Sequence, residues 1–288
     1  MIGLVEQEAP GTSLRRGCQV LCVSRATLYR HRHPRRPAAA EMELRDALQR
    51  AALAWPSYGY RRLTHELQRQ GYRVNHKRVR RLMRQDNLLC VRRRRFFATT
   101  DSAHGRLVYP NLARTLTVRG PNQLWVADIT YLRLRHEFVY LAVMLDAWSR
   151  RCIGWHLSRH LHEELALGAL EVALAHRPVP PGLVHHSDRG VQYASGAYTT
   201  RLTEAGLAIS MSRRGTPYDN AYAESFIKTL KHEEIYLNEY ADLAEAEASI
   251  EHFLVEVYNR RRLHSALGYR PPAEYEARAT QTMAVTPL

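Results

Sequence analysis

Three carboxylates, Asp128, Asp188 and Glu224, are the residues of this chain best suited to chemistry. Asp128 lies inside the apolar run 124–131 and Asp188 ends a second apolar run, 182–188, so we expect both acids to be carried by strands. Glu224 lies near the start of a segment that we expect to be a helix. Two acids on strands and one on a helix suit a site for two divalent cations, because hard cations such as Mg²⁺ prefer oxygen ligands and phosphate oxygens complete their shell.

The spacing around the third acid adds a basic group to this pattern. Thirty-five residues separate Asp188 from Glu224, and Lys231 follows Glu224 by seven residues, two helical turns later on the same face. Lys228 shares that face. Each residue also has an ordinary alternative. Asp128 could pair with an arginine, Asp188 could belong to a simple turn, Glu224 could be a surface acid, and the lysines could pair with acids along the helix.

Positive charge is confined to the first part of the chain. The net charge is +14 overall, but residues 1–120 carry 25 Lys and Arg against 8 Asp and Glu, a net of +17, whereas residues 121–288 carry a net of −3. A basic part joined to a near-neutral part favours a polyanion-binding module attached to another domain. The alternative is a solvated basic surface that keeps the protein soluble.

Composition argues against membrane and disulfide-rich classes. At 45% hydrophobic residues the chain is typical of a globular protein, and its longest apolar stretch, 138–145, is far too short to span a bilayer. The amino terminus lacks the basic region and cleavage site of a signal peptide. The four cysteines show no disulfide framework, so we expect a cytoplasmic protein without a membrane partner.

Two short helical segments near the amino terminus resemble DNA-binding motifs. Residues 12–31 predict a helix-turn-helix, with Ser24 as the cap of its second helix and with Arg25 and Arg30 suited to phosphate or groove contacts. A plain helical hairpin is the alternative. A zinc site built from Cys18, Cys22, His31 and His33 is disfavoured, because only one residue separates the histidines.

A second helix-turn-helix-like segment follows a predicted helix at 41–54. Asn75 is expected to cap a basic helix that turns three apolar residues inward. Its outward residues, which we expect to meet DNA, are Lys77, Arg78, Arg80, Arg81 and Arg84. Acids are nearly absent from this helix, so internal ion pairing is disfavoured. Beyond it, Arg92, Arg93, Arg94 and Arg95 predict an arm along the DNA backbone, because adjacent arginines repel each other unless phosphates lie between them; a solvated tether is the alternative.

The second half of the chain alternates strand and helix patterns. We expect strands at 124–134, 137–146, 151–157, 183–187 and 207–212, and helices at 163–176, 195–205, from about 220, and 241–262. Three successive strands followed by βαβ-type units predict an α/β fold, a mixed five-stranded sheet with helices on both faces. Asp219 or Asn220 is expected to cap the helix of Glu224, whereas Asp146, near a strand end, is left out of the site.

Five ordered motifs resemble one known family. They are Trp125–Tyr131, Val143–Arg150, His185–Gly190, Gly215–Phe226 and Tyr258–Gly268. Together they are similar to the DDE transposases and retroviral-type integrases, and most closely to the OrfB products of the insertion-sequence-three family, over roughly residues 119–276. The resemblance implies an RNase H-like integrase core, with residues 57–88 as the family's helical DNA-binding segment.

The resemblance also implies how the chain is organised and what it binds. We expect helix-turn-helix-like segments at 1–36 and 41–90, a basic linker at 91–118, and a catalytic core with a carboxyl-terminal helix at 119–280. Two Mg²⁺ ions, replaceable by Mn²⁺, would be held by the three acids, and Lys231 would touch DNA near the scissile phosphate. Expected partners are double-stranded transposon ends and target DNA, further copies of the chain, and an upstream OrfA product, separate or fused by frameshifting before Met1.

Two of these inferences leave alternatives open. His185 or His186 could contact a phosphate or be buried structural residues, and the basic cluster of Arg260, Arg261, Arg262 and His264 could approach DNA or brace the core. The leading functional hypothesis is a DNA transposase that cleaves and joins strands. The rivals are a DNA-binding regulator without catalysis and an RNase H-like nuclease that cleaves without joining.

Overall fold

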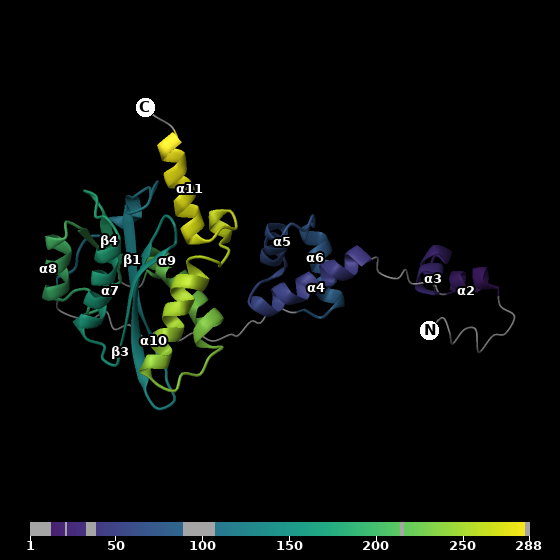
Figure 1. Ribbon diagram of the computed structural model, residues 1–288, viewed down its shortest axis with the longest axis horizontal. Coiled ribbons are helices and arrows are strands. Elements are labelled where there is room, and N and C mark those ends of the chain that lie inside the picture. The colour runs from purple at the N-terminus through teal and green to yellow at the C-terminus, as the bar shows by residue number, and fades with distance from the viewer. Residues whose placement is uncertain (1–12, 21, 33–38, 89–106, 214–215, 286–288) are drawn as a thin grey trace. The chain divides into compact units, whose positions relative to one another are not determined.

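The computed structural model of the protein describes residues 13–20, 22–32, 39–88, 107–213 and 216–285 (Figure 1). The chain divides into two compact units, residues 1–51 and 52–288. Arg92 to Arg95, the predicted arm, and His33 lie outside the described residues.

The first unit contains the two short helices predicted over residues 12–31. Its helices are α2 (Leu14–Val20) and α3 (Arg25–Arg32), and α4 (Ala39–Ala54) begins in the same unit. The hydroxyl of Ser24 accepts a hydrogen bond from the backbone N–H of Thr27 at 3.1 Å, so Ser24 caps α3 as its position predicts. Cys18 is buried and Cys22 is exposed. A buried cysteine on a helix face is the packing role expected of a small apolar side chain.

The second unit opens with a pair of short amphipathic helices, α5 (Tyr60–Arg69) and α6 (His76–Gln85). The side chain of Asn75 accepts a hydrogen bond from the N–H of Arg78 at 2.9 Å, which confirms the predicted cap. As the periodicity predicts, α6 buries Val79, Leu82 and Met83.

The remainder of the second unit is built on a mixed sheet of five strands. The strands are β1 (Leu124–Arg133), β2 (Phe138–Asp146), β3 (Cys152–Ser158), β4 (Val184–Ser187) and β5 (Ala208–Met211). They lie in the order β3-β2-β1-β4-β5. The pairs β1–β2 and β2–β3 are antiparallel, whereas β1–β4 and β4–β5 are parallel. The predicted mixed five-stranded sheet is confirmed.

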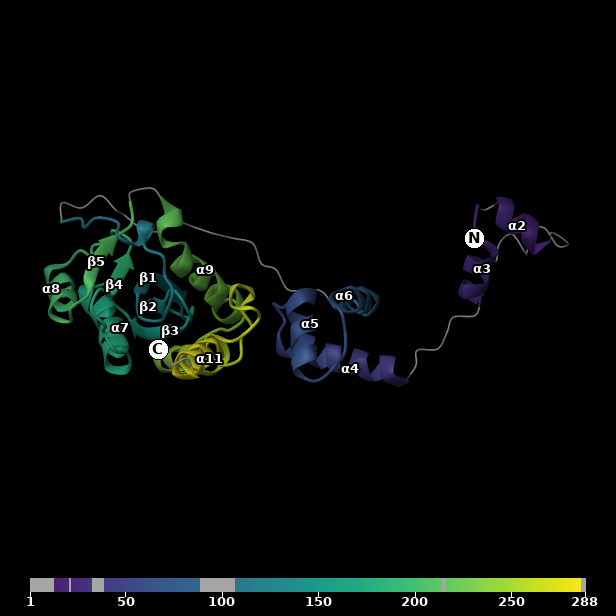
Figure 2. The same ribbon diagram turned by 90° about the horizontal axis from the view of Figure 1, so that it is seen from above.

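Helices cover both faces of this sheet, as Figure 2 shows. Helices α7 (Glu163–His176) and α8 (Gly196–Glu204) share one buried cluster with Trp125 and Ala127 of β1. Helices α9 (Ala221–Leu230) and α10 (Leu243–His252) share another with Leu124 and Val126. Neighbouring residues of a strand point to opposite faces, so β1 contributes to both cores. By the same alternation Asp128 belongs to the face of Leu124 and Val126, which α9 covers.

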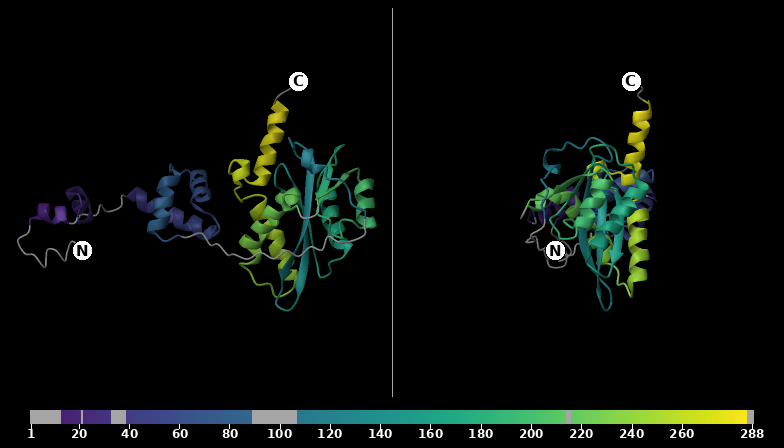
Figure 3. Two further views of the ribbon diagram at one scale, coloured as in Figure 1. Left: turned by 180° about the vertical axis from the view of Figure 1, so that it is seen from behind. Right: turned by 90° about the vertical axis from the view of Figure 1, so that its left-hand side faces the viewer.

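The carboxyl-terminal region differs from the sequence prediction. The single helix expected over 241–262 is wrong: α10 ends at His252 and continues as a π-helix over Phe253–Tyr258. The wider turn buries Phe253, Leu254 and Tyr258. A further helix, α11 (Pro272–Val285), begins at a proline and extends beyond the sheet (Figure 3).

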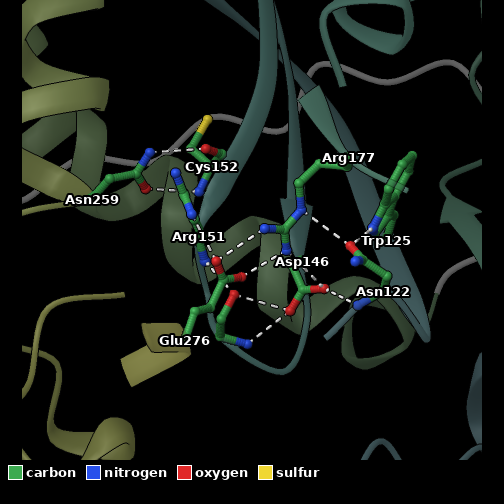
Figure 4. A network of polar contacts seen from close by, with 9 residues as sticks. Asn122, Trp125, Asp146, Arg151, Cys152, Arg177, Asn259 and Glu276 are labelled. Atoms are coloured by element: carbon green, nitrogen blue, oxygen red, sulfur yellow. Dashed lines mark hydrogen bonds and ion pairs between the residues drawn. The ribbon is translucent and has the colours of Figure 1, made fainter. Parts of the chain in front are cut away.

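A buried polar network ties α11 to the sheet (Figure 4). Asp146 is fully buried and accepts hydrogen bonds from the backbone N–H groups of Asn122 and Ser149, at 2.7 and 2.8 Å. Arg177 reaches Glu276 at 2.6 Å, and Arg151 reaches the same carboxylate at 2.8 Å. Burial works against the charge of Glu276, yet the hydrogen bonds from the two arginines hold its pKa below the usual range. Asp146 is thus committed to structure, which agrees with leaving it out of the site.

Among the described residues, no helix is long and apolar enough to cross a membrane.

Close packing of α7 on β3 yields the first testable prediction. A Cβ at Gly154 would lie only 2.2 Å from the carbonyl oxygen of Ala169. We expect Gly154→Ala to lower the free energy of unfolding by about 2 kcal/mol, because the helix must move away from the sheet. Denaturant titration of the full chain measures this. Gly196→Ala is the control, since nothing lies within 4 Å of a Cβ there; an equal decrease in both variants would contradict the packing argument.

Candidate active site

Strand register brings the first two acids together. In the parallel pairing of β1 with β4, Leu124 lies opposite Val184 and Val126 opposite His186. Two residues further along each strand, on the same face, are Asp128 and Asp188, the latter being the first residue after β4. Each carboxylate accepts a backbone hydrogen bond at 2.8 Å, from Ile129 for Asp128 and from Gly190 for Asp188. The backbone therefore fixes the orientation of both acids.

This juxtaposition carries an electrostatic cost. Burial raises the pKa of Asp128 to about 7, and repulsion from Asp188 and, more weakly, Glu224 adds to the effect. The backbone N–H of Ile129 and the ammonium of Lys231 act in the opposite direction. The net effect is that Asp128 binds a proton more tightly than an ordinary aspartate does, because protonation removes the repulsion from the neighbouring acids.

Helix α9 places Glu224 on the same side of the sheet. Glu224 lies in the first turn of α9 and is largely exposed, although partial loss of solvent around its carboxyl group raises its pKa. Asn220 occupies the cap position, but the predicted capping bond is wrong. Its side-chain Nδ2 instead donates to the carbonyl oxygen of Ala127 at 3.0 Å, next to Asp128. The amide thus links the start of α9 to the strand that carries the first acid.

Asp219, the other candidate cap, is also used elsewhere. It forms an ion pair with Arg213 at 3.0 Å, and hydrogen bonding to that guanidinium lowers the pKa of Asp219. The side chain therefore links the 3-10 helix Pro217–Asn220, which precedes α9, to Arg213 just beyond β5. A short-range capping rule cannot foresee this, because the partner becomes adjacent only when the loop closes.

Lys231 points toward the acids, whereas Lys228 faces solvent. Lys231 begins a π-helix, Lys231–Ile235, and its Nζ lies 4.6 Å from the centre of the Tyr131 ring. Burial lowers the pKa of Lys231, and the charge of Asp128 opposes that shift. Glu234, the alternative partner, accepts hydrogen bonds from Tyr240 and Ser249. Lys231 is accordingly the cation placed near Asp128.

The two histidines before Asp188 are structural. Both are fully buried. His186 contacts Ser210 at 2.7 Å and Ser212 at 3.0 Å, so its ring bridges residues of and just beyond β5. Burial lowers the pKa of His185 to about 3, which keeps it neutral. Neither ring is available to a phosphate.

The donor set fits a divalent cation, although the three acids are not gathered as a metal cluster. No group of three His, Cys, Asp or Glu side chains is placed to hold a metal among the described residues. Asp128 and Asp188 form the close pair, and Glu224 stands further off on α9. Carboxylate oxygens are the ligands that hard cations prefer, and a cation between the paired acids would offset their repulsion.

The predicted DNA-contacting residues are divided among several elements. Exposed positions comprise Arg25 on α3 and Lys77, Arg80, Arg81 and Arg84 on α6, whereas Arg78 is half-buried. The side chain of Arg30 lies outside the described part of the chain. In the later basic cluster, Arg262 is buried and forms two hydrogen bonds of 2.7 Å with Glu233, so this arginine braces the core.

The raised pKa of Asp128 predicts a pH-dependent stability. The pKa of Asp128 is 3.8 in the unfolded chain and about 7 in the folded protein. Between these pH values the folded state binds a proton that the unfolded state has released. The free energy of unfolding therefore falls as pH rises from about 4 to 7. The side chain keeps some contact with solvent, and screening reduces the cost to about 2 kcal/mol. We expect Asp128→Asn to stabilise the protein by this amount at pH 8 in EDTA and by little at pH 4.

Urea titrations at both pH values measure this difference. Glu247→Gln, which removes an exposed acid on α10, is the control and is expected to leave the pH profile unchanged. An Asp128→Asn variant whose stability falls with pH as steeply as that of the wild type would exclude Asp128 as the source.

Comparison with known proteins matches most of the chain to families of known proteins. The family model described as an integrase core domain matches residues 118–217, a second model with that description matches 205–272, and an HTH-like domain matches 39–96. Among solved structures, the HTLV-2 integrase catalytic core in complex with magnesium covers 55% of this chain and 99% of that chain, at 17% identity and a TM-score of 0.42.

Full-length relatives agree with these matches. Transposase InsF for insertion sequence IS3A from Escherichia coli is 36% identical over 94% of this chain and 96% of its own length. An insertion element IS600 protein of 31 kDa from Shigella sonnei is 38% identical over 93% of this chain and its whole length. The chain belongs to the transposases of the insertion-sequence-three (IS3) family and carries their integrase core.

Proposed function

We propose that this transposase cleaves and joins DNA strands with Asp128, Asp188 and Glu224 as the acids that hold two Mg²⁺ ions, for which Mn²⁺ can substitute. The observation that carries the proposal is the pairing of Asp128 with Asp188 at the junction of β1 and β4. Two carboxylates held together by backbone hydrogen bonds repel each other in the free protein. Such an arrangement is expected where binding of a cation converts the repulsion into attraction.

The chain's own residues prepare the reaction. Asp128, Asp188 and Glu224 would hold the two cations, which when bound would supply activation of the attacking hydroxyl, first of water and then of a DNA 3′ end, and stabilisation of the leaving 3′ oxygen. Asp128 and Asp188 hold their carboxylates at fixed positions through Ile129 and Gly190. Glu224 lies on a helix that Asn220 ties to β1, and its charge acts on Asp128. The phosphodiester would be bound between strand-borne and helix-borne acids.

Lys231 supplies a positive charge beside these acids. Its ammonium, held over the Tyr131 ring, lies near Asp128 and suits a phosphate oxygen of the bound strand. A lysine that is partly desolvated loses less hydration when the phosphate arrives. We therefore assign the contact near the scissile phosphate to Lys231 and a peripheral contact to the exposed Lys228.

DNA recognition belongs to the basic helical segments. The exposed basic face of α6 would lie along the phosphate backbone of transposon ends, with Arg25 and Arg30 of α3 contributing further contacts. Arg92 to Arg95 would extend the same interaction. Joining two ends to a target needs more than one active site, so we propose a homo-multimer on DNA, with the OrfA product as a further partner.

A strand-transfer assay tests the catalytic proposal. Labelled insertion-element ends and a plasmid target are incubated with the full chain in Mg²⁺, in Mn²⁺ and in EDTA. We expect joined products in either metal, none in EDTA, and a loss of at least about 100-fold in Glu224→Gln and Asp188→Asn, because each removes a charged ligand. Glu247→Gln is the matched control and should join ends normally.

Other outcomes point to the rival functions. Nicks that depend on Mg²⁺ without joined products would favour a nuclease. Sequence-specific binding with no cleavage in any metal would favour a regulator. Joining that survives in both acid variants would exclude the assigned residues.

The basic face of α6 predicts a salt-dependent affinity. Replacing Lys77, Arg80 and Arg84 together by alanine should weaken DNA binding and reduce the slope of log K against log salt by about 0.9 for each phosphate that is no longer neutralised. Fluorescence anisotropy over salt concentrations from about 50 to about 200 mM measures the slope. Arg159→Ala is the control, because Arg159 pairs with Glu137 at 3.1 Å and belongs to none of the basic segments assigned to DNA. An unchanged slope in the triple variant would remove α6 from the interface.

A further inference from the structure

The hydroxyl group of Tyr193 is a buried donor that lacks an acceptor. Tyr193 is only 2% exposed. Its hydroxyl is shielded from water and makes no hydrogen bond with any residue that the structure describes. Buried polar groups are nearly always paired, so an unpaired one calls for a specific explanation. If packing alone were required, phenylalanine would fill the same space.

The phenol is placed close to the paired acids. Tyr193 follows Asp188 in the loop after β4, and Gly190 lies between them. A Cβ on Gly190 would lie 3.0 Å from Asp188 Oδ1 and 3.7 Å from Cδ2 of the Tyr193 ring. The Asp188 carboxylate and the Tyr193 ring therefore both lie next to Gly190. The negative charges of Asp128 and Asp188 both act on the phenol. The hydroxyl therefore lies in the field of both candidate ligands.

The aromatic ring is held rigidly in that position. It packs edge to face against Tyr198, with ring centres 5.4 Å apart, and lies 6.2 Å from the ring of His185. Tyr198 uses its own hydroxyl in a 2.9 Å hydrogen bond with Nε2 of His185. Two neighbouring tyrosines thus differ in one respect: one hydroxyl has a protein partner and the other has none among the described residues.

Chemistry limits what the missing acceptor can be. Burial, followed by the nearby Tyr198 and the two acids, raises the pKa of Tyr193 well above its usual value, so the phenol remains protonated and can donate. Mg²⁺ keeps several waters when it binds to one or two carboxylates, and these waters need hydrogen-bond partners in the surrounding protein. A rigid donor beside the acid pair meets that requirement.

We infer that Tyr193 is a positioning residue, whose hydroxyl donates a hydrogen bond to the shell of oxygen atoms around a divalent cation held by Asp128 and Asp188. The inference rests on the proposed function and deepens it, since it names a group beyond the three acids. It also accounts for a buried hydroxyl that no described residue of the protein satisfies. The bond forms only when the cation brings its oxygen shell into the site.

Tyr193→Phe in the full chain separates this role from a structural one. Binding of Mn²⁺ and of Mg²⁺, each alone and without DNA, is measured by calorimetric titration, and the unfolding midpoint is measured in EDTA. We expect the variant to bind both ions about 3- to 10-fold more weakly, because one neutral hydrogen bond is removed. Its midpoint in EDTA should be unchanged or higher, since the substitution removes an unpaired buried hydroxyl.

Tyr198→Phe is the matched control. It removes a hydroxyl that already has a partner, so it should lower the unfolding midpoint and leave cation affinity unchanged. Cation affinity in Tyr193→Phe equal to that of the wild type would overturn the inference while leaving the proposed function intact. A wild-type chain that binds neither ion would overturn both, and Asp188→Asn, which must abolish binding, verifies that the titration reports on this site.

Discussion

Two like charges on adjacent parallel strands are the constraint on which the rest of the structure depends. The register of β1 with β4 brings the backbone positions of Asp128 and Asp188 to the same end of the two neighbouring strands. The fold absorbs the repulsion by raising the pKa of Asp128 and by fixing both carboxylates through backbone N–H groups. A sheet buried on both faces is rigid enough to sustain this arrangement.

The surrounding elements aim further groups at this pair. Asn220 ties α9 to the carbonyl next to Asp128, which brings Glu224 to the correct face. The change from α- to π-helix at Lys231 lies where the lysine meets the Tyr131 ring. In the buried cluster that α7 and α8 share with β1, Tyr193 and Tyr198 support the loop that follows Asp188. Strand, helix and loop each contribute one part, and none of them forms the site alone.

Local patterns predict the strands and most of the helices, because alternation and helical periodicity are visible in short stretches of sequence. The same patterns single out Asp128, Asp188 and Glu224 as candidate ligands. The features that these patterns did not predict depend on residues distant in the chain. The sequence around Asn220 predicts a helix cap, whereas its side chain donates to the carbonyl oxygen of Ala127, 93 positions away. Arg177 and Glu276 are 99 positions apart, and nothing near either residue indicates the other. The change to a π-helix after His252 accompanies burial of Phe253 and Tyr258, which periodicity alone does not reveal.

The Glu276 network has a consequence for the gene that encodes it. Arg177, at the end of α7, is mostly buried and shares the Glu276 carboxylate with Arg151, and Glu276 lies near the carboxyl end of the chain. All five strands are therefore synthesised before Glu276, the second carboxylate that pairs with Arg177, emerges from the ribosome. Until then the ion-pair partner of Arg177 is Asp146, at 3.7 Å, so α11 acts as a latch that adds the closer carboxylate, at 2.6 Å, after the sheet has been made. An insertion element truncated at its distal end would lose this latch while retaining every residue of the acid triad.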